Sequence, residues 1–142
     1  MTVERLFADT NLFLRYITND VPKQAQAFEA LLKRAGRGEL HFVTHPLVIA
    51  EIVWTLESYF GLPKEDIMNK VLAILNTPGL EVSDNEIVLQ AILWYVEKNV
   101  DFIDAYSTAW MFSQDIRKAC SFNSKHFGRF EGVETWIPGE RD

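Results

Sequence analysis

Acidic side chains stand at three points of the sequence where the neighbouring residues are mostly apolar. Asp9 lies in LFADTNLFLR, Glu51 lies in PLVIAEIVW, and Asp101 and Asp104 lie in VDFIDAY. Carboxylate oxygens from distant parts of a chain suit a hard cation such as magnesium, which prefers oxygen ligands. Such an ion can polarise a phosphoryl oxygen and lower the pKa of a bound water. The residue types therefore indicate metal-assisted chemistry on a phosphate ester as one use of these acids.

Asp9 follows the first predicted strand, and Asn123 follows the fourth. Ligands of open α/β sheets bind outside the carboxyl ends of parallel strands, so these two polar side chains could be neighbours. The alternative is that each is a helix cap or a turn residue, since Asp and Asn readily bond to nearby backbone. Position alone does not separate the two interpretations.

Glu51 is the only charged residue of a helical run that we expect to be buried on most sides. An ionised carboxylate in such surroundings is costly unless it meets a cation, a metal or good donors. The alternative is a glutamate at the edge of the core that pairs with Lys or Arg. We favour the functional interpretation.

Asp101 and Asp104 are three residues apart at the start of a predicted helix and share one face of it. Asp101 has a structural explanation, because an N-cap carboxylate accepts the free amides of the first turn. Asp104 is left as the acid with no structural duty beyond a favourable interaction with the helix dipole. His41 and His45 flank the second predicted strand and are expected to be structural. His126 could lie near the acidic residues, but a place in a surface loop is the expectation that we favour.

Short apolar runs alternate with longer segments of helical period, an order typical of βαβα units and a parallel sheet. Thr10 or Asn11 is expected to cap the first helix. No repeat or linker is visible, so residues 1–142 are predicted to form one domain. The expected strands are 5–8, 40–44, 80–82, 118–122 and 133–136, and the expected helices are 10–18, 21–37, 47–60, 63–76, 83–98 and 101–116.

The composition sets limits on the class of protein. Twenty Asp and Glu against 14 Lys and Arg give a net charge of −6, which argues against a basic protein that coats nucleic acid but does not exclude a nuclease. The single cysteine, Cys120, excludes an intrachain disulfide and is expected to pack in the interior. No apolar run approaches the roughly 20 residues of a membrane span, and no signal-peptide pattern is visible. We therefore expect a cytoplasmic protein.

The acidic motifs, taken in order with SFN at residues 121–123, resemble those of the PIN-domain family and its VapC-type ribonuclease toxins of toxin–antitoxin pairs. The resemblance covers nearly the whole chain. It implies a three-layer α/β/α sandwich around a central parallel five-stranded sheet, with acids at its carboxyl edge that bind Mg²⁺ or Mn²⁺. PIN toxins cut RNA, commonly tRNA or ribosomal RNA, by metal-activated water. They usually form homodimers, and a small antitoxin protein inhibits them.

Carried over by residue, the resemblance implies that Asp9, Glu51 and Asp104 are catalytic, with Asp9 and Asp104 as metal ligands. Asn11, Asp101 and Asn123 would support the site. Asn123 departs from the pattern, because the family usually has a fourth acid there, so weaker cation binding is expected. A degenerate PIN module that binds RNA or a protein without cutting is the alternative. A haloacid-dehalogenase-like phosphotransferase fits poorly, since it requires Asp where this chain has Asn11.

Overall fold

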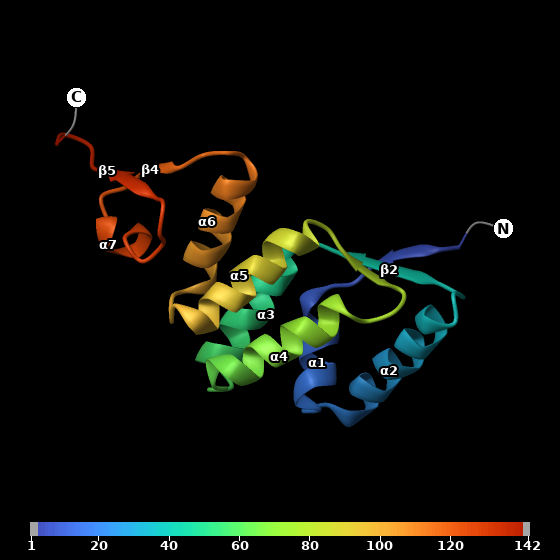
Figure 1. Cartoon of the computed structure of the whole chain (residues 1–142). Helices are drawn as coiled ribbons and strands as arrows, with labels where there is room; N and C mark the ends of the chain where they lie inside the picture. Colours follow the sequence, from blue (N-terminus) through green and yellow to red (C-terminus); the bar gives the residue numbers. More distant parts are fainter. Residues whose placement is uncertain (1–2, 141–142) are drawn as a thin grey trace. The chain divides into compact units, whose positions relative to one another are not determined.

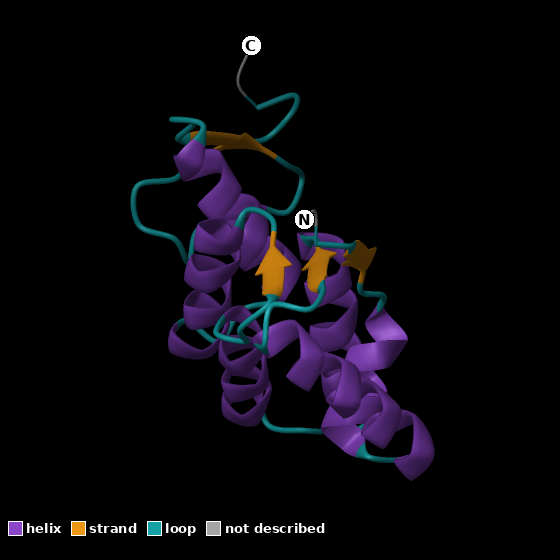
Figure 2. Cartoon of the chain, turned by 90° about the vertical axis from the view of Figure 1, so that its right-hand side faces the viewer, coloured by secondary structure: helices purple, strands orange, loops and turns teal. Residues whose placement is uncertain are grey.

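The computed structural model describes residues 3–140, and the chain divides into two compact units, Met1–Asn85 and Glu86–Asp142 (Figure 1). Each unit combines helices with short parallel strands, and helices account for most of the ribbon (Figure 2). The predicted α/β class with parallel strands is confirmed. No helix in the described part of the chain is long and apolar enough to span a membrane.

The first unit contains a three-stranded parallel sheet in the order β1-β2-β3. In the register of the sheet, Phe42 of the central strand lies between Leu6 and Leu80. The strands are joined by pairs of helices, which supply the crossover that a parallel connection requires. The elements are β1 (Arg5–Phe7), α1 (Thr10–Thr18), α2 (Pro22–Gly36), β2 (His41–Thr44), α3 (Pro46–Ser58), α4 (Lys64–Leu75) and β3 (Leu80–Val82).

An aromatic cluster forms part of the core of the first unit. The ring of Phe28 on α2 makes T-shaped contacts with Phe13 on α1, at 5.5 Å between centroids, and with Phe42 on β2, at 5.6 Å. All three side chains are buried, and α1 packs against both α2 and α3. These edge-to-face contacts hold α1 and α2 against the central strand, adding to the effect of apolar burial.

A close approach of two backbone segments requires glycine at position 79, just before β3. Gly79 has a φ of 80°, and a Cβ there would lie 2.4 Å from the carbonyl oxygen of Ala35 at the end of α2. Glycine alone removes both the steric cost of positive φ and this overlap. The amide of Phe42 donates to the carbonyl of Gly79 at 2.8 Å, which ties the approach to the sheet.

The described residues of the second unit form three helices and a two-stranded parallel sheet. The ring of the half-buried Trp94 lies 5.2 Å from Phe130 and 5.9 Å from Phe112, and the neighbouring Tyr95 is completely buried. The helix α5 begins at the last residue of the first unit. The elements are α5 (Asn85–Glu97), α6 (Phe102–Ser113), β4 (Lys118–Cys120), α7 (Ser124–Phe127) and β5 (Glu134–Trp136).

The five strands were expected in one sheet, and this expectation is corrected: hydrogen bonds join them into a three-stranded and a two-stranded sheet. The two-stranded sheet pairs β4 with β5, with Ala119 opposite Thr135. Each strand of this pair has only three residues, and its pairing depends on bonds to distant segments that no local pattern specifies.

Cys120 is exposed, so the prediction that it packs in the interior is wrong. Side chains alternate along a strand, and Ala119 occupies the buried position of β4. The next residue must therefore face outward.

Candidate active site

Asp9 is the N-cap of α1 and lies just beyond the carboxyl end of β1. Its Oδ1 accepts a hydrogen bond from the amide of Thr10 at 2.8 Å. The expectation that Thr10 or Asn11 caps this helix is wrong, because Thr10 is already its first residue and is buried. The second carboxylate oxygen of Asp9 has no hydrogen bond to any residue between 3 and 140. Asp9 therefore has a structural role and one oxygen left for a ligand.

The backbone before Asp9 is held in place by the central strand. Ala8 is fully buried, and its amide donates to the carbonyl of Val43 at 2.9 Å. The hydroxyl of Thr44, which is also buried, donates to the carbonyl of Ala8 at 2.9 Å. These two bonds anchor the residue that precedes Asp9 at the end of the sheet.

Glu51 is exposed on α3, so the prediction that it is buried is wrong. The buried face of α3 carries Ile49, Ile52 and Val53, and Glu51 lies on the opposite face with Leu47 and Trp54, which are 75% and 69% exposed. Hydrophobic residues therefore occur on both faces of this helix, which is why composition suggested burial on all sides. Glu51 forms no ion pair or hydrogen bond within the described residues, so the alternative of a Lys or Arg partner is not observed either.

Asn11 is exposed in the first turn of α1. It lines a cavity of about 410 Å³ in the first unit, together with Arg15 and Gln24. No hydrogen bond joins Asn11 to Asp9 within the part of the chain that the structure describes. A direct support of the Asp9 carboxylate by Asn11 is therefore not observed.

Asp101 is the N-cap residue of α6, but its side chain accepts no capping hydrogen bond. The expectation that it binds the first-turn amides is therefore wrong. Its backbone is extended, with φ −67° and ψ 144°, and the residue is exposed. Asp101 is left without a hydrogen-bonded partner among residues 3–140. It is therefore a stronger candidate for a supporting role at a metal site than its sequence position indicated.

Asp104 has the partner that sequence reasoning did not assign. Its Oδ2 lies 3.0 Å from Nδ1 of His126, and the carboxylate is only 22% exposed. The Nε2 atom of the same imidazole lies 3.1 Å from Nδ2 of Asn123. His126 was expected in a surface loop, yet it lies in α7 and joins two of the candidate residues. The spacing of three between Asn123 and His126 was the one signal in the sequence that they could meet.

These groups surround a cavity of about 200 Å³ inside the second unit. Asp101 just before α6 and Asp104 in its first turn line the cavity, and His126 and Arg129 line it from the segment around α7. The guanidinium of Arg129 donates to the carbonyl of Asn99 at 2.9 Å, which holds a positive charge at the rim. The structure thus brings together Asp101, Asp104 and His126, whereas Asp9 and Glu51 belong to the first unit.

The candidate residues match a hard divalent cation by their chemistry. Glu51 and Asp101 have exposed carboxylates without ion pairs to described residues, and Asp9 has one free oxygen. Magnesium and manganese favour such oxygen donors and retain several waters, so few protein ligands are needed. Within residues 3–140, no three or more His, Cys, Asp or Glu side chains are already arranged as a metal cluster.

Comparisons with known proteins agree with the motifs. The sequence profile of the PIN domain matches residues 6–133. The chain is also 25% identical, over 117 residues, to a protein named VapC ribonuclease from Aquifex aeolicus (strain VF5). That alignment covers 82% of this chain and 86% of the relative. The profile spans all the candidate acids and runs from within β1 to beyond α7, so the resemblance inferred from the motifs is confirmed, and the chain belongs to the PIN domain family.

Proposed function

We propose that this protein is a metal-dependent endoribonuclease and the toxin of a type II toxin–antitoxin pair, which cleaves tRNA or ribosomal RNA. The observation that carries the proposal is the PIN-domain match over residues 6–133, which spans Asp9, Glu51 and Asp104 together. The similarity to the VapC ribonuclease of Aquifex aeolicus supports the same activity. A bound Mg²⁺ or Mn²⁺ would polarise the scissile phosphate and lower the pKa of the attacking water.

We assign Asp9, Glu51 and Asp104 to catalysis, with Asp9 and Asp104 as metal ligands. Asp9 offers the oxygen that its capping bond leaves free, and Asp104 offers Oδ1, since Oδ2 faces His126. Asn11, Asp101 and Asn123 are supporting residues in this proposal. We further propose that residues 1–142 act as one PIN domain in the cytoplasm.

A degenerate PIN module that binds RNA or a protein without cutting is the second candidate. The observation that favours it is Asn123, which stands where the family usually has an acid and contacts an imidazole. Against it, a binding module gains nothing from holding the part-buried carboxylate of Asp104, which is 22% exposed, against His126.

We propose a homodimer in which α3 contributes to the interface. Trp54 near the carboxyl end of α3 and Tyr59 just after the helix are 69% and 79% exposed, and large exposed apolar side chains are typical of buried interface cores. The proposed interface therefore lies at this end of the helix and does not cover Glu51. Trp54→Glu is expected to shift the protein from dimer to monomer in light scattering. A wild-type monomer at micromolar concentration would refute this assignment.

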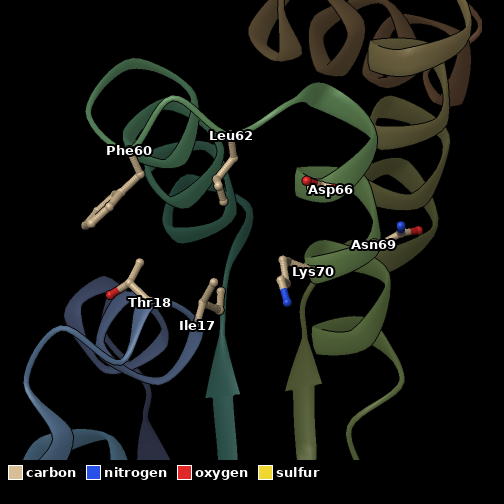
Figure 3. A pocket seen from close by; sticks show the side chains of 7 residues that line it. All are labelled: Ile17, Thr18, Phe60, Leu62, Asp66, Asn69 and Lys70. Carbon is tan, nitrogen blue, oxygen red and sulfur yellow. The ribbon is translucent and has the colours of Figure 1, made fainter.

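We assign the antitoxin to a hollow of about 590 Å³ in the first unit (Figure 3). Ile17, Phe60 and Leu62 supply an apolar wall, and Asp66 and Lys70 of α4 stand beside it. An amphipathic helix or tail with charges of both signs would fit this lining. Leu62→Glu is expected to abolish copurification with the small protein encoded by a neighbouring reading frame, and unchanged copurification would exclude this surface.

The deciding experiment is cleavage of a total tRNA and ribosomal RNA pool with Mg²⁺, Mn²⁺ or EDTA. Asp9→Asn, Glu51→Gln and Asp104→Asn are compared with Glu65→Gln, a matched control that neutralises another helical glutamate of the first unit. Discrete metal-dependent cuts that are lost in the three variants and kept in the control are expected. RNA binding without cleavage under every metal would establish the non-cutting module instead.

A further inference from the structure

We propose that His126 is a positioning residue for Asp104, and that Asn123 acts by orienting His126 and not as a metal ligand. The inference rests on the proposed function, because it names how one catalytic carboxylate is held. It assigns a role to His126, which lies outside the acidic motifs, and a new role to Asn123, which stands where the family usually has an acid.

The hydrogen-bond chemistry of the two contacts determines their direction. The Nδ2 atom of Asn123 belongs to an amide NH2 group, which can donate a hydrogen bond but cannot accept one. Nε2 of His126, at 3.1 Å, is therefore the acceptor. A neutral imidazole that accepts at Nε2 carries its proton on Nδ1. Nδ1–H then donates to Oδ2 of Asp104 across 3.0 Å. Asn123, His126 and Asp104 thus form a directional chain of two hydrogen bonds.

The local fold supports this chain. The amide of Asn123 donates to the hydroxyl oxygen of Ser121 at 2.9 Å, which anchors the residue before α7. The single turn of α7 then places His126 beside Asn123, and α7 packs against α6, which carries Asp104. The imidazole of His126 is 46% exposed at the rim of the 200 Å³ cavity. Because it buries little surface, His126 contributes a hydrogen-bond donor at this position and little packing.

The chain has a consequence for the carboxylate of Asp104. Oδ2 is occupied by His126, so Oδ1 is the oxygen presented for a ligand. Outer hydrogen bonds of this kind fix the orientation of a ligating side chain, and their loss typically costs 10- to 100-fold in activity or metal affinity. A carboxylate at position 123 has no hydrogen to donate to Nε2, so the amide is the group that this arrangement requires.

The first test is the tautomer of His126 in the metal-free full chain. Long-range ¹H–¹⁵N correlation spectra at pH 7–9 are expected to show a proton on Nδ1, and Asn123→Ala is expected to shift the population toward Nε2–H. A wild-type imidazole that is protonated on Nε2, or on both nitrogens, would overturn the inference. This readout does not depend on nuclease activity, so it stands even if the proposed function fails.

The second test separates positioning from RNA contact. His126→Ala is expected to lower kcat by roughly 10- to 100-fold and to weaken Mn²⁺ binding measured by electron paramagnetic resonance, with KM for RNA unchanged. His126→Asn, whose amide can donate from nearly the same place as Nδ1, is expected to restore most of both. His41→Ala is the matched control, since it breaks another histidine–carboxylate pair, with Glu81 at 3.3 Å.

Three results would contradict the inference. One is a rise in KM alone for His126→Ala, which would mean that His126 contacts RNA. The second is an equal loss in His126→Ala and His126→Asn, and the third is higher activity or tighter Mn²⁺ binding in Asn123→Asp, which would make position 123 a ligand. If wild-type protein cleaves no RNA, the proposed function fails, and Mn²⁺ binding and the tautomer still decide the role of His126.

Discussion

The double role of Asp9 can be separated by two substitutions. Asp9→Ala removes the oxygen that accepts from the amide of Thr10 at 2.8 Å, and loss of such a cap costs about 1 kcal/mol, with a range of about 0.5–2. Asp9→Asn keeps an oxygen at the same place and loses only the charge at the start of α1, which costs about 0.3–1 kcal/mol at low ionic strength. Both variants lose a proposed metal ligand.

Urea unfolding at low and at high salt distinguishes the two contributions. At about 1 M salt the Debye length is about 3 Å, so the deficit of Asp9→Asn is expected to shrink toward zero while that of Asp9→Ala persists. Nuclease activity is expected to be lost in both variants, including at salt concentrations where Asp9→Asn is as stable as wild type. The reasoning is refuted if Asp9→Ala is as stable as wild type, or if Asp9→Asn keeps its nuclease activity.

Three further perturbations follow from the packing of the first unit. Thr44→Val removes the donor to the buried carbonyl of Ala8 and is expected to lower the free energy of unfolding by about 1–3 kcal/mol in urea. Thr44→Ser keeps that donor and is the control. Equal stability of Thr44→Val and wild type would contradict the role of the bond. Gly79→Ala is expected to lower the free energy of unfolding by more than about 2 kcal/mol, because the cost of positive φ adds to the overlap of the new Cβ with Ala35. A small change in Tm would show that the end of α2 and the residue before β3 separate easily. The hydrogen bond from Arg37 holds the pKa of Glu39 below its ordinary value of 4.5. The contribution of this pair to the stability of the fold is therefore full above pH 4.5 and is lost as the pH falls through the lowered pKa. A carboxyl ¹³C titration of Glu39 with the ordinary midpoint would exclude this effect.

The local elements could be predicted closely because their signals are short-range. Residues 80–82 form a strand with the expected bounds, and the helices expected at 21–37 and 63–76 are found as Pro22–Gly36 and Lys64–Leu75. Proline in the first turn and apolar periodicity depend only on neighbours a few residues away.

Burial was harder to predict than secondary structure. The helix that carries Glu51 is apolar on two faces, and only one of them is buried. Hydrophobicity records the free energy of leaving water and does not say which face finds a partner. The same limit explains why Cys120 was assigned to the interior.

The sequence by itself determined the family, the order of the elements and the identity of the acidic candidates, because these follow from residue types and their spacing along the chain. The tertiary structure alone decided that Asp9 caps α1, that Asp101 caps nothing, and that Asp104 meets His126. Those outcomes depend on backbone geometry and on contacts between residues 22 positions apart. Such contacts form only when the free energy gained by packing exceeds the entropy cost of bringing distant segments together, and a local sequence pattern does not report that difference.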